Sequence, residues 1–301
     1  MEERKTIYLC LAHMSETGEE QKYVKEAFDT NWVVPLGPNV NGFEDDLKAF
    51  VSKNSDGSEL SREVVALSAG TAAVHLGLLA CGVGPGDEVC VQSFTFCASS
   101  HPITYLGATP VFIDSEPDSW NMDPELLEKA IIDRKEKTGK YPKAIVPVAL
   151  YGMPYDCDKI MAISEKYGIP VVEDAAEGCG SRWKGQVLGT FGKFGVLSFN
   201  GNKMITTSGG GALICQDAES KNNVMWYATQ ARDAYPYYQH TAIGYNYRMS
   251  NVCAGIGRGQ MTVLEDHIAH HKHVQELYKE LLKDVEGVTL HEAPNADYDS
   301  N

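Results

Sequence analysis

Short apolar segments alternate with helical patterns over the first two thirds of the chain. The apolar segments are four to seven residues long, which is the length of buried strands, and small or apolar residues at helical spacing lie between them. This alternation predicts an α/β fold with a mostly parallel sheet, in which ligands bind beyond the carboxyl ends of the strands. The expected strands are residues 64–67, 88–92, 110–113, 144–150 and 171–174, and the expected helices are 71–81, 96–106, 124–132 and 157–167.

Two helices are expected before the first strand. Residues 17–20 read Thr-Gly-Glu-Glu, a capping-box pattern that predicts a helix reaching about residue 28. Residues 42–51 place Phe43, Leu47 and Phe50 on one helical face. The segment between these helices is rich in Pro and Gly and predicts a loop.

The pattern changes after residue 190. The apolar runs 194–199 and 212–215 have a Gly-rich turn and no helix between them, so they predict neighbouring strands without a crossover. A helix over 217–230 follows, and then a long helical pattern from an N-cap at Ser250 to about residue 285.

A large domain over residues 1–245 and a second unit over 246–301 are the expected domains. The second unit contains the long helical pattern and one strand, residues 288–290. One helix and one strand cannot bury an apolar face of their own, so this small α+β domain is expected to be incomplete.

The formal net charge of −15 over 301 residues argues against nucleic acid and anionic membrane as partners, because both need a basic surface. It does not exclude phosphate ligands, which backbone N–H groups can bind. No apolar stretch has the length of a membrane span, and the charged N-terminus lacks a signal-peptide pattern. We therefore expect a cytoplasmic protein.

No metal site is expected. The eight cysteines are scattered without a C-x-x-C pair, and most have apolar neighbours, which is typical of buried free thiols. His267, His270, His271 and His273 have helical spacing that could pair two imidazoles on a metal. No acidic or cysteine ligands accompany them, so a solvated helix face is the favoured interpretation.

Lys203 and Asp174 are the candidate catalytic residues. Lys203 follows an expected buried strand and lies among Asn and Gly residues, where burial would favour the neutral amine that a Schiff base needs. Asp174 ends the expected strand 171–174, where a carboxylate can hold a cofactor's ring nitrogen protonated. A solvent-reaching lysine and a helix-capping aspartate are the structural alternatives.

Two further segments are candidates for cofactor binding. Residues 68–71 (Ser-Ala-Gly-Thr) join a strand to a helix, so Gly70 and Thr71 could present N–H groups to an anion, with Ser198 adding a hydroxyl. Phe96 follows a strand, where a flat ring can stack on a cofactor. An ordinary turn and ordinary core packing are the alternatives. The glycine fingerprint of nicotinamide dehydrogenases is missing.

Taken in order, these segments resemble the DegT/DnrJ/EryC1/StrS family of sugar aminotransferases, which use pyridoxal 5′-phosphate (PLP) on the type I fold of PLP-dependent transferases. The resemblance covers nearly the whole chain. The segments that carry it are 68–71, Thr95 and Phe96, 147–152, 173–177, 198–203, 209–211 and 244–249.

The resemblance implies a role for each matching residue. Lys203 corresponds to the Schiff-base lysine and Asp174 to the acid at the pyridine nitrogen. Gly70, Thr71 and Ser198 correspond to the phosphate site, and Phe96 to the aromatic residue on the ring. Glu177 falls beside the ring hydroxyl and the substrate. Asn246 corresponds to an asparagine that reaches the cofactor phosphate of a neighbouring subunit, which implies a homodimer with shared sites.

Residues 31–38 and 198–211 are most similar to the subgroup that aminates UDP-linked 4-keto-6-deoxy-N-acetylhexosamines, as in bacillosamine synthesis. The expected reaction transfers the amino group of L-glutamate to such a nucleotide sugar. The alternatives are an aminotransferase for a dTDP-linked 3- or 4-keto sugar and a non-catalytic regulatory relative. Family members continue past this point with strands and helices that complete the small domain, so we expect the chain to be a truncated form.

Overall fold

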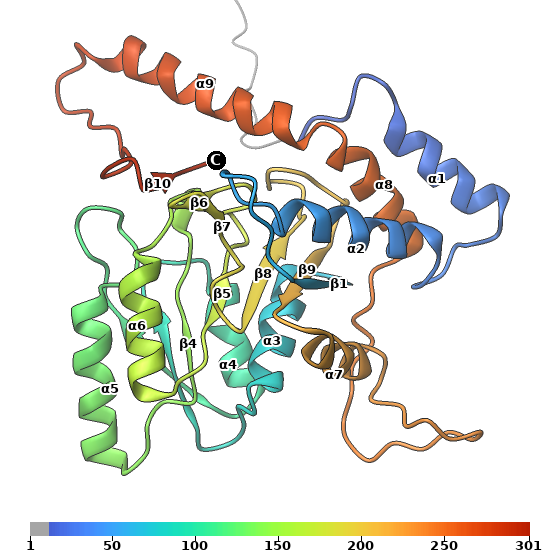
Figure 1. Cartoon of the computed structure of the whole chain (residues 1–301), viewed down its shortest axis with the longest axis horizontal. Helices are drawn as coiled ribbons and strands as arrows, with labels where there is room; N and C mark the ends of the chain where they lie inside the picture. The colour runs from blue at the N-terminus through green and yellow to red at the C-terminus, as the bar shows by residue number, and fades with distance from the viewer. Residues whose placement is uncertain (1–11) are drawn as a thin grey trace, which may run out of the picture.

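A computed structural model describes residues 12–301 and contains one mixed central sheet (Figure 1). Four strands pair in the order β1-β9-β8-β5 and three in the order β3-β2-β4. Parallel bridges from Ile145 to Val171 and from Val148 to Asp174 join β4 to β5, which makes the two groups continuous. The bounds of these strands are β1 Glu63–Leu67, β2 Glu88–Gln92, β3 Thr109–Ile113, β4 Ala144–Val146, β5 Val172–Asp174, β8 Phe194–Ser198 and β9 Gly211–Cys215.

Every strand of this sheet except β9 runs in the same direction. The pairs of β2 with β3, β2 with β4 and β5 with β8 are parallel, whereas β9 is antiparallel to both of its neighbours, β1 and β8. The expected α/β class with a mostly parallel sheet is therefore confirmed. The expected pairing of the runs at 194–199 and 212–215 without a crossover is also confirmed, as the hairpin β8-β9.

Helices cover both faces of the sheet because alternate residues of each strand are apolar on opposite sides. On β1, Val64 and Ala66 belong to one buried cluster, and Val65 and Leu67 belong to the other. The first cluster includes residues of α2 (Pro38–Val51), α5 (Pro124–Thr138), α6 (Cys157–Tyr167) and α8 (Asn251–Met261), and the second includes residues of α3 (Gly70–Ala80), α4 (His101–Tyr105) and α7 (Ala218–Ala228).

Two expected elements are shorter than predicted. The helix expected over 96–106 is a 3-10 turn, Cys97–Ser99, followed by the short helix α4. Pro102 explains the break, because proline is tolerated in the first turn of a helix but not in its interior. The strand expected over 144–150 ends at Val146, directly before Pro147, which has no N–H for a further ladder bond.

The prediction that Thr17 begins a capping box is wrong, although the helix it predicts is present. Helix α1 spans Glu19–Asp29, and Gly18, in a left-handed conformation, precedes it. Ser15 provides the polar contacts expected of Thr17: its N–H and its hydroxyl donate to the Glu20 carboxylate at 2.8 and 2.5 Å. Gln260 of α8 donates to the same carboxylate at 2.7 Å, so the start of α1 is tied to α8.

The long C-terminal helical pattern forms two helices. Ser250 caps α8 as expected, accepting from the N–H of Val252 at 3.3 Å, and a new helix, α9, spans Leu264–Leu282. The strand expected over 288–290 was wrong, because those residues pair with no strand in the described structure. The last strand is instead β10 (Tyr298–Asp299), which pairs with β6 (Arg182–Trp183) beside β7 (Gln186–Val187).

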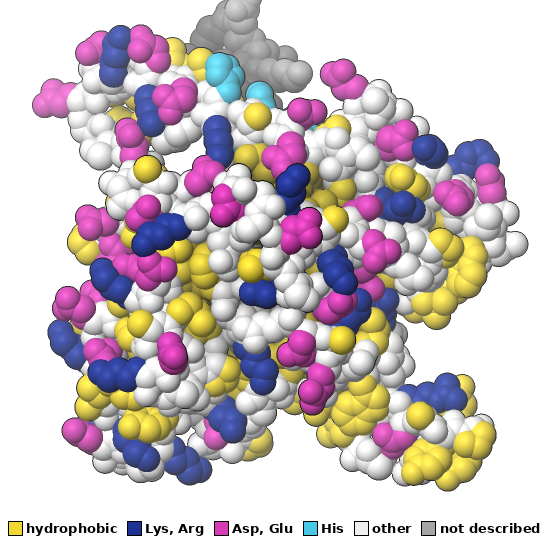
Figure 2. Space-filling model, in the orientation of Figure 1, with side chains coloured by type: hydrophobic (Ala, Val, Ile, Leu, Met, Phe, Trp, Pro, Cys, Tyr) yellow, Lys and Arg dark blue, Asp and Glu magenta, His cyan; other side chains and the backbone are white. Residues whose placement is uncertain are grey.

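The space-filling view shows acidic and basic side chains interspersed over the face drawn, without a continuous basic patch (Figure 2). Cys90, Cys157, Cys179 and Cys215 are buried, as expected of free thiols, whereas Cys97 is exposed and Cys10 lies outside the described residues. None of the described helices combines the length and hydropathy needed to cross a membrane. The domain division at residue 245 stays a prediction.

The centre of the sheet contains a buried carboxylate, Glu173 of β5, which is 1% exposed. It accepts N–H groups from Gly189 at 2.9 Å and from Phe191 and Gly192 at 2.6 Å. Burial raises the pKa of Glu173, and these N–H donors oppose the rise. The loop after β7 is therefore fixed to the sheet by one side chain.

Replacing Glu173 with alanine should destabilise the fold strongly, because three N–H groups lose their acceptor at once. A buried donor left without a partner costs about 1–3 kcal/mol, so we expect a loss of at least about 3 kcal/mol in the free energy of unfolding. Glu173→Gln, which keeps one acceptor oxygen, should lose less. Urea denaturation measures both variants, and an alanine variant within about 1 kcal/mol of the parent would contradict the role given to Glu173.

Candidate active site

Asp174, the last residue of β5, points to the opposite face of the sheet from Glu173, because successive strand residues alternate. The side chain is 6% exposed. One carboxylate oxygen, Oδ2, accepts the hydroxyl of Ser99 at 2.6 Å, and the other, Oδ1, accepts the N–H of Ala176 at 3.2 Å. The carboxylate thus caps the following turn, as in the structural alternative, and also has a side-chain partner from another element.

The charge on Asp174 is balanced between opposing effects. Burial raises its pKa, while the hydrogen bonds from Ser99 and Ala176 and the nearby ammonium of Lys203 lower it, and the charge of Glu177 raises it. The net direction is upward. Lys203 and Glu177 therefore lie close enough to Asp174 to influence its charge, and a carboxylate perturbed in this way is typical of functional sites.

Lys203 lies in the turn that follows β8, where its N–H donates to the carbonyl of Asn200 at 2.9 Å. Its side chain is only 16% exposed, and Nζ lies 3.1 Å from Oε1 of Glu177. The lysine therefore does not extend into solvent, which was the alternative to a role in the site. An amine held at a strand end beside carboxylates can act as a nucleophile and as an acid or base.

Glu177 is held from three directions. Its Oε2 accepts the N–H of Tyr151 at 2.7 Å, which leaves Oε1 facing Lys203. Tyr151 has a φ of 52°, a left-handed conformation that non-glycine residues seldom adopt and that often marks functional sites. The backbone carbonyl of Glu177 accepts the side-chain amide of Asn301 at 2.8 Å.

The helix N-terminus expected to bind an anion is formed by α3, which begins at Gly70 without a side-chain cap. Its first N–H groups are therefore free of a capping acceptor, as an anion site requires. A Cβ on Gly70 would lie 3.0 Å from Cβ of Ser198, and one on Gly211 would lie 2.4 Å from the N of Gly70. A side chain at position 211 would therefore displace the helix start, and glycine at 70 lets that start lie directly beside Ser198.

Phe96 and Asn246 are both exposed in the single chain. Phe96 is 74% exposed and lies directly before the 3-10 turn that carries Ser99. Asn246 pairs through its backbone with Thr229, in the segment between α7 and α8. Their predicted contacts, with a cofactor ring and with the site of a second subunit, stay predictions.

The sequence reasoning missed Ser99, Tyr151 and Asn301. Ser99 gives no signal in the sequence, because residues 96–106 have a helical pattern in which a serine has no obvious partner. The left-handed backbone of Tyr151 has no sequence signal, since non-glycine residues rarely adopt it. Asn301 reaches Glu177 through a tertiary contact that no local pattern encodes.

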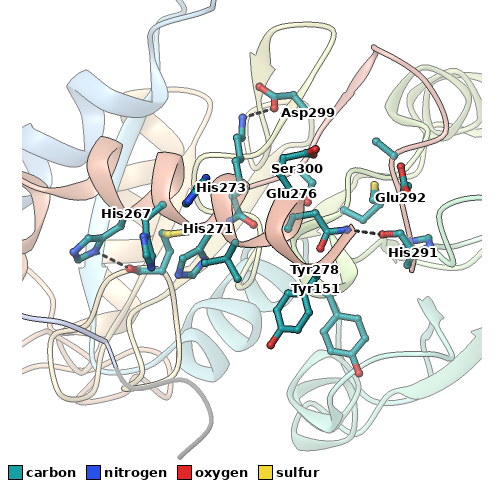
Figure 3. A pocket seen from close by; sticks show the side chains of 18 of the residues that line it. Tyr151, His267, His271, His273, Glu276, Tyr278, His291, Glu292, Asp299 and Ser300 are labelled. Carbon is teal, nitrogen blue, oxygen red and sulfur yellow. Dashed lines mark hydrogen bonds and ion pairs between the residues drawn. The ribbon is translucent and has the colours of Figure 1, made fainter. Parts of the chain in front are cut away.

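A cavity of about 1110 Å³ opens beside Lys203, between α9 and the body of the chain (Figure 3). Tyr151 and Asn301 line it together with Lys203, and His267, His270, His271 and His273 approach it from α9. Nδ1 of His267 lies 3.3 Å from the carbonyl oxygen of Met204. The residues that the structure describes include no group of three or more His, Cys, Asp or Glu side chains arranged to hold a metal ion.

These residues fit PLP in chemical type. The uncapped start of α3 suits a phosphate, the buried carboxylate of Asp174 suits a protonated ring nitrogen, and the amine of Lys203 suits the aldehyde. The assignment of each residue to a part of the cofactor stays a prediction.

Comparisons with known proteins agree with this chemistry. The model of the DegT/DnrJ/EryC1/StrS aminotransferase family matches residues 14–301. The chain is 47% identical, over 94% of its length and 70% of the relative's, to the putative pyridoxal phosphate-dependent aminotransferase EpsN of Bacillus subtilis. It is 37% identical, over 83% of its length and 65% of the relative's, to the UDP-2-acetamido-2-deoxy-3-oxo-D-glucuronate aminotransferase of Pseudomonas aeruginosa.

A solved structure supports the same conclusion for the fold. The crystal structure of a DegT DnrJ EryC1 StrS aminotransferase from Brucella abortus superposes with a TM-score of 0.86 at 31% sequence identity, over 94% of this chain and 73% of that one. The type I fold of PLP-dependent transferases is thereby confirmed. The chain belongs to the DegT/DnrJ/EryC1/StrS aminotransferase family and is a PLP-dependent enzyme.

Proposed function

We propose that the chain transfers the amino group of L-glutamate to the 4-keto carbon of a nucleotide-linked 6-deoxy sugar, UDP-2-acetamido-2,6-dideoxy-4-hexulose. The observation that carries this proposal is the pairing of Lys203 with Glu177 beside the buried carboxylate of Asp174. Family membership supports amino-group transfer to a nucleotide sugar. The similarity of residues 31–38 and 198–211 to the subgroup that aminates UDP-linked 4-keto sugars supports the choice of substrate.

The residues of the chain divide the work of transamination. PLP, when bound, supplies an aldehyde that condenses with amines and a ring that accepts electrons from the carbon next to nitrogen. With the cofactor bound, Nζ of Lys203 would take the proton from Cα of the amino donor and return it to the carbon of the cofactor's aldehyde group. Glu177 holds Nζ in place, because Tyr151 fixes its other oxygen.

Asp174 and the start of α3 hold the cofactor in position. Asp174 would keep a proton on the ring nitrogen, which would let the ring accept electrons. The uncapped N–H groups at Gly70 and Thr71 would bind the phosphate, with the hydroxyl of Ser198 close to Gly70. Phe96 would cover one face of the ring. These roles join three parts of the sheet at one edge.

A homodimer with shared sites is part of the proposal, with Asn246 reaching the partner's cofactor phosphate. The arm between α7 and α8 projects from the body of the chain (Figure 1). It carries Tyr235, Tyr237 and Tyr238, which are 52%, 59% and 80% exposed. Figure 2 shows apolar side chains gathered at the lower right, where this arm lies. Exposed apolar patches often mark protein interfaces, which supports dimerisation through this arm. The cytoplasmic location stays a prediction.

Lys203→Ala should remove turnover and the covalent attachment of PLP together. We expect a rate loss of at least about 10³-fold, because the variant lacks both the nucleophile and the proton carrier. Borohydride reduction followed by peptide mapping should place the pyridoxyl label on Lys203 in the parent and nowhere in the variant. Lys193→Ala removes an exposed lysine and should keep the label. Full activity of the Lys203 variant would contradict the mechanism.

Asp174→Asn should keep the fold and lose about 10²–10³-fold in rate, since a neutral amide cannot stabilise charge on the ring nitrogen as a carboxylate does. The measurement is kcat for glutamate and keto-sugar, with thermal unfolding as the check on folding. A rate within a few-fold of the parent would mean that Asp174 only caps its turn.

The product should carry its new amino group at C4 of a UDP-linked 6-deoxy-N-acetylhexosamine. NMR of the purified product identifies the aminated carbon. The rival is amination at C3, which the relative named for a 3-oxo-glucuronate favours. A nitrogen at C3, or turnover of dTDP-linked sugars alone, would reject the proposed substrate while leaving the transaminase chemistry intact.

A further inference from the structure

Three side chains form a series of hydrogen bonds that leads from the partly buried Thr95 to the buried carboxylate of Asp174. The hydroxyl of Thr95 lies 2.8 Å from that of Ser99, and Ser99 donates to Oδ2 of Asp174 at 2.6 Å. Ser99 is 1% exposed and Asp174 is 6% exposed, so water has little access to the contact between them. Neither Thr95 nor Ser99 has another role in the mechanism above.

The number of protons available decides which hydroxyl donates in each of these hydrogen bonds. An ionised carboxylate only accepts, and a serine hydroxyl has one proton to give. If Asp174 is ionised, the hydroxyl of Ser99 must donate to Oδ2, and the hydroxyl of Thr95 must then donate to Ser99. If Asp174 were protonated, it could donate to Ser99, and Ser99 could donate to Thr95. Which hydroxyl donates between Thr95 and Ser99 therefore depends on the protonation state of Asp174.

We propose that Ser99, supported by Thr95, is a positioning residue that keeps Asp174 ionised and oriented toward the ring nitrogen of PLP. A buried carboxylate needs donors to remain charged, and hydrogen bonds to an ionised group are about twice as strong as neutral ones. Ala176 occupies Oδ1 from the backbone, and Ser99 is the side-chain donor on Oδ2. The ring nitrogen then binds a carboxylate whose rotation is fixed at both oxygens.

Other charged groups near Asp174 cannot replace this donor. The ammonium of Lys203 favours the ionised form, but Glu177 disfavours it and also pairs with Lys203. Nζ of Lys203 would also gain and lose a proton as it acts as acid and base, so its charge would not be constant through the reaction. The hydroxyl of Ser99 is neutral and stays in place throughout.

The turn that supplies Ser99 also fixes the residue expected on the cofactor ring. Ser99 ends the 3-10 turn Cys97–Ser99, and its N–H donates to the carbonyl of Phe96 at 3.1 Å. Phe96 on the ring face and Asp174 at the ring nitrogen are thus linked through a single residue. A substitution at Ser99 would therefore alter the positions of both Phe96 and Asp174.

The test measures PLP binding to the full chain as a function of pH, by the visible absorbance of the bound cofactor. Ser99→Ala should weaken binding about tenfold near neutral pH, which is the loss expected for a hydrogen bond to a charged group. The acid limb of the binding curve should move to higher pH, because a carboxylate that loses a donor has a raised pKa. Ser99→Thr should restore the parent curve, and Thr95→Val should move it less than Ser99→Ala.

Ser100→Ala is the matched control. Ser100 neighbours Ser99 on the same turn, but its hydroxyl donates to the carbonyl of Cys97 at 3.2 Å and not to Asp174. This variant should bind PLP as the parent does. Thermal unfolding without cofactor shows that each variant folds, and if Ser99→Ala fails to fold, the pH shift in Thr95→Val decides the question.

Two results would overturn the proposal. One is a Ser99→Ala variant with the parent's affinity and acid limb. The other is a loss that is equal at every pH and is not rescued by Ser99→Thr, which would show a packing role alone. The test uses no sugar, so it is independent of the proposed substrate, and failure of the parent itself to bind PLP would instead count against the assignment of the site.

Discussion

Two adjacent carboxylates buried at the carboxyl end of β5 are the constraint around which this site is arranged. Glu173 and Asp174 point to opposite faces of the same strand, where isolated charges would be costly. Each face supplies donors from a different part of the chain: the loop 189–192 for Glu173, and the turn at Ser99 for Asp174. One carboxylate fixes a loop, and the other remains available for chemistry.

The hairpin β8-β9 brings the other residues of the site to the same edge of the sheet as Asp174. Since β9 returns antiparallel beside β8, Ser198 and Gly211 pair at the same edge as the start of α3. The turn that leaves β8 places Lys203 next to Glu177, which follows β5 by only a few residues. An anion site, an amine and a carboxylate thus meet because strand ends meet, and no long loop is needed to assemble them.

Local periodicity predicted much of this arrangement, because strand and helix patterns depend on neighbours in sequence. Strand β2 and helix α6 have the bounds that the pattern predicts. Prediction was wrong where a proline or a tertiary contact overrides the local pattern. Pro102 divides the segment after Phe96, and Ser15 replaces Thr17 because Glu20 is also held by Gln260, more than two hundred residues away. Ser99 illustrates the same limit, since its partner Asp174 belongs to another strand.

The acidity of the chain is compatible with anionic ligands for a related reason. A net charge of −15 repels a phosphate at long range, but that repulsion is screened beyond about 8–10 Å at physiological ionic strength. Within that distance the phosphate would meet the uncapped N–H groups of α3, whose partial charges are fixed by the backbone. Glycine at 70 and 211 allows this helix start to reach the strand end, so local geometry and not overall charge decides binding. The same reasoning applies to Asp174, where neutral hydroxyl and N–H donors stabilise a charge that the surface composition alone would disfavour.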